Sequence, residues 1–201
     1  MEKRLATCEI LQRKMSKKQK LKGLRLILGD QLNHFHSWFD QGKDYLYVMM
    51  EIKPESEYVT HHIQKIVGIF AAMRNFALEL KKKGFQVEYF KITDQHNHHS
   101  FKKNIELLYG QYELTNFEYQ QPDEWRLDEI LGDIKGGQIV SSEHFFTERQ
   151  DVEEFFSEKK SFLMEPFYRH MRKKYNILMT DDEPTGGKWN YDKSNRNKLP
   201  K

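Results

Sequence analysis

The stretch from Leu24 to Leu32 limits the fold of this chain more than any other. Four of its first five residues are aliphatic, and the apolar run stops at Gly29 and Asp30. Such a run is typical of a strand buried on both faces of a parallel sheet. Ligands of open α/β sheets gather beyond the carboxyl ends of the strands, where a glycine lets the backbone approach closely. The stretch therefore predicts a ligand edge that offers Asp30 and Gln31, with an ordinary Gly-Asp turn as the alternative.

Four further segments have the composition of strands, and helical patterns separate most of them. Their order predicts an α/β fold: a Rossmann-like, doubly wound, mainly parallel five-stranded sheet with flanking helices. The third strand partly alternates polar and apolar residues, which indicates an edge position. Beyond the first run, the predicted strands are 45–52, 85–92, 114–119 and 138–141, and the helices between them are 57–83, 101–108 and 122–131.

Two carboxylates are expected at the same edge of this sheet. Glu51 ends the second predicted strand as Asp30 ends the first. Such a pair can hold a polar ligand or act as an acid and a base. The alternative is a structural Glu51 that caps a loop or pairs with a lysine. The histidines at 34 and 36, and those of the loop 93–100, are predicted to lie in ordinary loops, because no scaffolded set of metal ligands accompanies them.

Composition and missing motifs exclude several classes of protein. Cys8 is the single cysteine among 201 residues, which excludes an internal disulfide framework and a cysteine-built cluster. The sequence has no run of 18 apolar residues and no apolar segment of a secretory signal near Met1, which suits a cytoplasmic protein. It also has no G-x-G-x-x-G after the first strand, no P-loop and no G-x-S-x-G, so the usual dinucleotide, P-loop and serine-nucleophile readings lose support.

Charge divides the chain into a basic tail and an acidic body. The first 22 residues hold eight basic and two acidic residues, whereas the other residues hold 25 basic and 28 acidic ones. We expect 1–22 to be a disordered tail, with Met15 as an alternative start. The domain is predicted over 23–178, ending with helices at 147–160 and 164–175, and a linker over 179–201. Only weak binding of DNA is expected from such a body.

Six segments, taken in order, together point to one family. They are LILGDQL (26–32), YVTHH (58–62), AMRNF (72–76), DEWR (123–126), FYRHMR (167–172) and GGKWNYD (186–192). On these segments the sequence resembles the N-terminal domain of the bacterial deoxyribodipyrimidine photolyase-related proteins, the iron–sulfur (6-4) photolyase and cryptochrome branch. The resemblance covers roughly residues 24–200.

The resemblance implies a light-harvesting role. Family members carry an antenna pigment, 6,7-dimethyl-8-ribityllumazine, at the carboxyl edge of this domain. Matched by motif, Gly29, Asp30, Gln31 and Leu32 would line one side of the pigment site and Glu51 another. FAD, the iron–sulfur cluster and the lesion site belong to a helical domain that this sequence does not match.

The expected function is therefore an antenna-chromophore domain of a photolyase-like or cryptochrome-like DNA repair flavoprotein. It is not expected to be catalytic alone, to hold a metal or to enter a membrane, and its partner would be the helical FAD domain, in cis or in trans. Two alternatives remain from the residues. One is a nucleotide-binding module of stress-protein type, and the other is a small hydrolase or transferase that uses Asp30 and Glu51.

Overall fold

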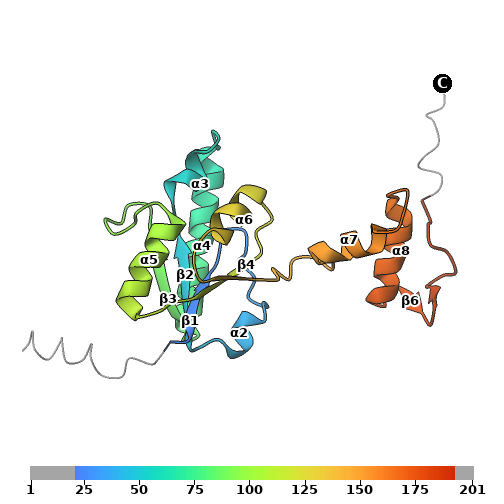
Figure 1. Ribbon diagram of the computed structural model, residues 1–201, viewed down its shortest axis with the longest axis horizontal. Coiled ribbons are helices and arrows are strands. Elements are labelled where there is room, and N and C mark those ends of the chain that lie inside the picture. Colours follow the sequence, from blue (N-terminus) through green and yellow to red (C-terminus); the bar gives the residue numbers. More distant parts are fainter. Residues whose placement is uncertain (1–20, 193–201) are drawn as a thin grey trace, which may run out of the picture. The chain divides into compact units, whose positions relative to one another are not determined.

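The computed structural model describes residues 21–192, which divide into two compact units (Figure 1). The boundary between the units falls between Ser142 and Glu143, whereas the sequence placed the end of the domain at 178. Nearly all of the predicted basic tail, and the end of the predicted linker from 193 on, lie outside the described residues. Each unit is described by itself.

The first unit is built on a five-stranded sheet in which all neighbouring strands are parallel. The strand order is β3-β2-β1-β4-β5, so the chain adds strands on one side of β1 and then on the other. This order confirms the doubly wound Rossmann-like fold and the edge position of β3, and it puts a topological switch point between β1 and β4. The strands are β1 Gly23–Leu26, β2 Tyr45–Met50, β3 Gln86–Phe90, β4 Phe117–Gln120 and β5 Gly137–Val140.

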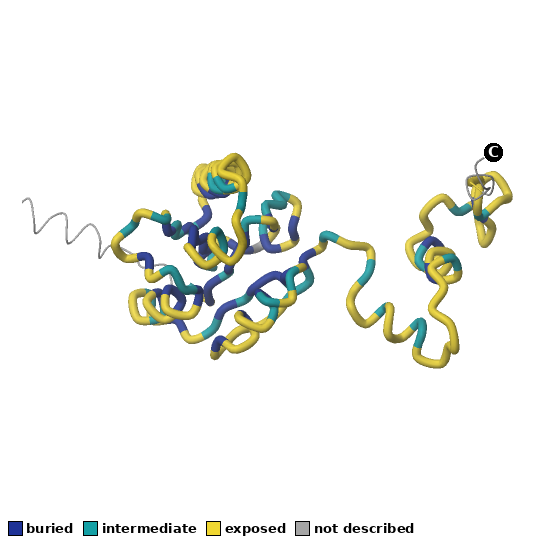
Figure 2. The backbone as a smooth tube through the Cα atoms, turned by 90° about the horizontal axis from the view of Figure 1, so that it is seen from above, coloured by how far each residue is buried: buried dark blue, intermediate teal, exposed yellow. Residues whose placement is uncertain are grey.

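Helices cover both faces of the sheet, and each face has its own hydrophobic core. Residues of α2 (Trp38–Gln41) and α4 (Ile63–Lys82) pack with one face, and residues of α5 (Phe101–Tyr112) and α6 (Trp125–Gly132) pack with the other. Leu24 and Leu26 belong to the second core and Ile27 to the first, because successive side chains of a strand point to opposite faces. Burial on both sides explains why β2, and the run from Leu24 to Leu28 apart from Arg25, are apolar. Figure 2 shows buried backbone in dark blue inside the first unit and exposed backbone in yellow around it.

The predicted helix 57–83 is wrong at its start. A separate short helix, α3 (Lys53–Glu57), forms first and has a proline in its first turn. The backbone is extended at His62, whose side chain accepts a hydrogen bond from the amide of Gln64 at 3.2 Å and so caps α4. The apolar spacing from Val59 to Ile63 and Ile66 continues across the break before α4, so periodicity alone did not reveal the interruption. Ile63 and Val67, in the first turns of α4, remain 65% and 58% exposed.

The second unit pairs two helices with a small hairpin. Its helices are α7 (Arg149–Phe156) and α8 (Met164–Lys174), and the hairpin joins β6 (Met179–Thr180) to β7 (Glu183–Pro184). Buried Phe167 of α8 packs edge-on against Phe155 of α7, with ring centroids 5.3 Å apart. The region after 178, which the sequence assigned to an extended linker, therefore contains a hairpin.

Candidate functional site

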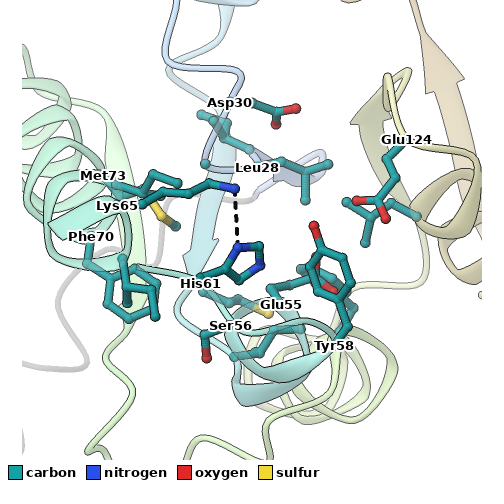
Figure 3. Close-up of a pocket in the computed structure, with 18 residues that line it drawn as sticks. Leu28, Asp30, Glu55, Ser56, Tyr58, His61, Lys65, Phe70, Met73 and Glu124 are labelled. Carbon is teal, nitrogen blue, oxygen red and sulfur yellow. Dashed lines mark hydrogen bonds between the residues drawn. The ribbon is translucent and has the colours of Figure 1, made fainter. Parts of the chain in front are cut away.

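A cavity of about 290 Å³ lies beyond the carboxyl end of β1 (Figure 3). Its wall combines the residues after β1 and β2 with side chains from α3, α4, α5 and α6. This is the edge at which open α/β sheets bind ligands, beside the switch point between β1 and β4. The lining residues are Ile27, Leu28, Gly29, Asp30, Met50, Ile52, Glu55, Ser56, Tyr58, His61, Lys65, Ile66, Ile69, Phe70, Met73, Phe101, Glu124 and Leu127.

The deep part of the pocket is apolar. Leu28 and Met50 come from the core on one face of the sheet, and Met73 comes from the core on the other face. Figure 3 shows Phe70 and Met73 on one side of the pocket and Tyr58 and Glu124 on the other. A cavity with apolar walls and a few polar groups suits a largely flat organic ligand that has polar substituents.

Gly29 lets α4 pack close to the end of β1. A Cβ atom at position 29 would lie 3.0 Å from Cγ2 of Ile69 and 3.2 Å from Sδ of Met73, which is tighter than ordinary contact. Asp30, the next residue, is exposed and lines the pocket. These two residues of the predicted site therefore do meet at the cavity.

Gln31 and Leu32 contact the elements that form the pocket without lining it. Gln31 is buried; its Oε1 accepts a hydrogen bond from the amide of Leu28 at 3.1 Å, and its Nε2 donates one to the carbonyl of Gln120 at 3.2 Å. This side chain ties the end of β1 to the end of β4. Leu32 packs against the core on the α4 face. Neither residue is among those described residues that line the cavity.

Glu51 is fully buried in a network of hydrogen bonds. Arg74 of α4 binds both of its oxygens, at 2.6 Å to Oε1 and 2.7 Å to Oε2. The hydroxyl of Tyr89 donates to Oε1 at 2.6 Å, and the amide of Ile92 donates to Oε2 at 2.9 Å. The carbonyl of Glu51 also accepts from Nδ2 of Asn97 at 2.7 Å. Its side chain joins β2, β3 and α4, and Glu51 is not among the described residues that line the cavity.

The network shifts the pKa values of its members. Burial raises the pKa of Glu51, but the hydrogen bonds from Arg74, Tyr89 and the Ile92 amide outweigh it, so the net pKa is lowered. Burial and the neighbouring carboxylate raise the pKa of Tyr89. Glu51 is therefore held as a carboxylate and Tyr89 as a neutral donor, which is the combination that the hydrogen bonds require. This geometry does not place Asp30 and Glu51 across the pocket as an acid–base pair.

Apart from Asp30, the polar residues of the pocket are ones that the sequence analysis did not select as site residues. Glu55 belongs to α3, Tyr58 and His61 lie in the turn before α4, and Glu124 lies at the start of α6. Lys65 Nζ lies 3.3 Å from Nδ1 of His61. The signal in the sequence was indirect, because segments 58–62 and 123–126 stood out only as family motifs. Among the described residues no group of three or more potential metal ligands is present.

Comparison with known proteins identifies the family. Residues 25–201 match the model of the family described as deoxyribodipyrimidine photo-lyase-related protein. The chain belongs to this family. In this photolyase-related protein, two of the motif segments meet at the pocket, because the guanidinium carbon of Arg126 lies 4.4 Å from the ring centroid of Tyr58.

Two curated proteins illustrate the relationship. A (6-4) photolyase of Agrobacterium fabrum is 36% identical over 180 residues, which cover 86% of this chain and 36% of the photolyase. An uncharacterized protein of Acanthamoeba polyphaga mimivirus is 24% identical over 194 residues, which cover 90% of this chain and 96% of the viral protein. The photolyase-related chain thus spans about a third of the photolyase but nearly all of the viral protein.

Proposed function

We propose that this chain is the antenna-chromophore domain of a photolyase-like or cryptochrome-like DNA repair flavoprotein. The observation that carries the proposal is the apolar cavity at the carboxyl edge of β1, in a chain that belongs to the photolyase-related family. The pigment proposed for it is 6,7-dimethyl-8-ribityllumazine, which would absorb light and pass the excitation to a flavin.

The residues around the cavity suit such a pigment. Its flat ring system would lie against the apolar side chains of Ile66, Phe70 and Met73. Its ribityl hydroxyls and ring N–H group would find acceptors in the carboxylates of Asp30 and Glu124. Gln31, Leu32 and Glu51 would contribute indirectly, since they hold the ends of the strands and α4 in place.

Repair of DNA would require a second domain. In this proposal a helical domain, in cis or in trans, provides FAD, the iron–sulfur cluster and the contacts to damaged DNA. The chain spans only 36% of the (6-4) photolyase that it resembles, which leaves most of that protein to such a domain. By itself the chain would harvest light without catalysis. Among the described residues no helix is long and apolar enough to cross a membrane.

Titration of the purified chain with 6,7-dimethyl-8-ribityllumazine tests the proposal. We expect saturable binding, seen as a change in pigment fluorescence. Ile66→Trp should abolish it, because the larger side chain would fill the cavity that Ile66 lines. Val67→Trp is the matched control, since Val67 is its neighbour on α4, is 58% exposed and does not line the cavity.

Two results would contradict the proposal. One is the absence of saturable binding by the unaltered chain at millimolar pigment. The other is displacement of the pigment by AMP or ATP at similar concentrations, which would favour a nucleotide-binding module instead.

A further inference from the structure

One wall of the pocket is attached to the rest of the unit in an unusual way. This wall is the α3 segment, residues 53–61, which contributes Glu55, Tyr58 and His61 to the cavity. None of its residues is buried. Its amides hydrogen-bond locally, as from Glu55 to the carbonyl of Ile52 and from Tyr58 to the carbonyl of Pro54. Such a segment has little of its own to hold it in place.

Arg126 of α6 supplies the connection. Its Nη1 donates to Oε1 of Glu55 at 2.8 Å and its Nη2 to Oε2 at 2.7 Å, which is the bidentate geometry of a strong arginine–carboxylate pair. The guanidinium also lies over the ring of Tyr58. Within the described chain, the side-chain hydrogen bonds that join 53–60 to another element all run to Arg126; His61 adds its contact with Lys65.

Arg126 also holds a second residue on the same side of the pocket. Its Nε donates to Oε1 of Glu124 at 2.9 Å, and Glu124 lines the cavity while Arg126 does not. One guanidinium therefore joins the carboxylates of Glu55 and Glu124 and the ring of Tyr58. The carboxylates hold the pKa of Arg126 above its ordinary value, so the cation persists across the usual pH range.

We propose that Arg126 is a positioning residue of the pocket, which holds the α3 segment against α6 and so keeps Glu55 and Tyr58 in the wall. Ligand enters and leaves when this tie opens and the α3 segment moves away. The identity of the ligand rests on the proposed function, whereas the tie itself does not.

Amide hydrogen exchange of the chain without pigment tests the tie directly. Arg126→Gln should raise exchange of residues 53–62 by about tenfold, since a partly exposed ion pair and a cation–π contact each contribute modestly. Amides of β1 and β2 should not change. Arg169→Gln is the matched control: it breaks a pair with Glu165 in the second unit, also at 2.8 Å, and should leave 53–62 unaffected.

Pigment dissociation gives the functional readout. Arg126→Gln should speed dissociation by about tenfold. Arg126→Lys keeps the charge but cannot form the bidentate pair with Glu55, so it should restore only part of the slow rate. If Arg126→Gln does not fold, Glu55→Gln removes the bidentate partner alone and should raise exchange only in 53–62. Unchanged exchange in that segment, or an equal rise throughout the sheet, overturns the inference. A chain that binds no pigment but shows the local rise would overturn the proposed function and leave the tie standing.

Discussion

The ends of β1 and β2 look alike in sequence and differ in the structure. Each strand is apolar and is followed by an acid, Asp30 in one case and Glu51 in the other. Asp30 is exposed at the rim of the cavity, whereas Glu51 is fully buried. The carboxylate of Glu51 accepts hydrogen bonds from the side chains of Arg74 and Tyr89 and from the amide of Ile92. One acid lines the cavity and the other holds the sheet edge together.

The difference follows from the direction of each side chain and from what surrounds it. Met50 belongs to the core on the α5 and α6 face, so Glu51, the next residue, points to the α4 face. There Arg74 and Tyr89 donate hydrogen bonds to its carboxylate. Asp30 comes after Gly29, in a turn, and leaves the sheet. The position of an acid at the end of a parallel strand therefore does not decide its exposure, which depends on the turn that follows the strand and on the elements packed around it.

The largest effect is expected from Glu51→Ala. It would leave the Tyr89 hydroxyl and the Ile92 amide without their acceptor, so the free energy of unfolding should fall by about 2–3 kcal/mol. Urea unfolding followed by circular dichroism measures this. Exposed Glu57→Ala is the control and should stay within about 0.5 kcal/mol of the unaltered chain. Equal stability of the two variants would show that the hydrogen bonds of Glu51 do not stabilise the fold.

Asp30→Ala should show the opposite pattern. Loss of a charged acceptor at the rim should weaken pigment binding roughly tenfold, while unfolding changes by no more than about 0.5 kcal/mol. Fluorescence titration and urea unfolding of the same preparation measure both quantities. Asp40→Ala, also an exposed acid, should change neither. A loss of stability without a loss of affinity would reverse the roles given to the two strand ends.

Acid should weaken the region around Glu51 in particular. Because the pKa of Glu51 in the folded chain lies below its ordinary value of 4.5, its contribution is fully present above that pH and is lost as the pH falls through the folded-state pKa. The free energy of unfolding should therefore fall more steeply below about pH 4.5 in the unaltered chain than in Glu51→Gln. Parallel slopes in urea unfolding from pH 6 to pH 3 would contradict this.

The smallest effect is expected from Tyr89→Phe. It removes one neutral donor, while Arg74 and the Ile92 amide still bind Glu51, so the cost should be about 1 kcal/mol. Pigment affinity should not change, since Tyr89 does not line the cavity in the described chain. A loss of affinity with unchanged stability would place Tyr89 in the binding site rather than in the support of β3.

The strands and the helices were largely predictable because they depend on local patterns. The second strand was expected at 45–52 and is found at Tyr45–Met50, and α8 was expected at 164–175 and is found at Met164–Lys174. The start of α4 was not predictable in this way. Its interruption depends on the capping side chain of His62 and on Pro54 in the first turn of a separate helix, while the apolar spacing from Val59 to Ile63 continues across the break.

The candidate site was predictable only at the turn that follows β1. The Gly29-Asp30 turn follows from where β1 stops, and the structure places both residues at the cavity. The polar wall was missed because Glu55, which lines the cavity, and Arg126, which binds it, are separated by 71 positions in the chain. Nothing in the local pattern of either segment indicates that an arginine on α6 binds a glutamate on α3.

The sequence by itself determined the fold class and the edge of the sheet at which the cavity lies, because apolar runs, periodicities and a glycine turn act over a few residues. Only the tertiary structure decided which acid faces the cavity and which is buried. That choice depends on the donors that α4 and β3 bring to the end of β2, and on Arg126, which α6 brings to α3. Such contacts arise from packing between distant segments, and so they appear only when the whole unit has folded.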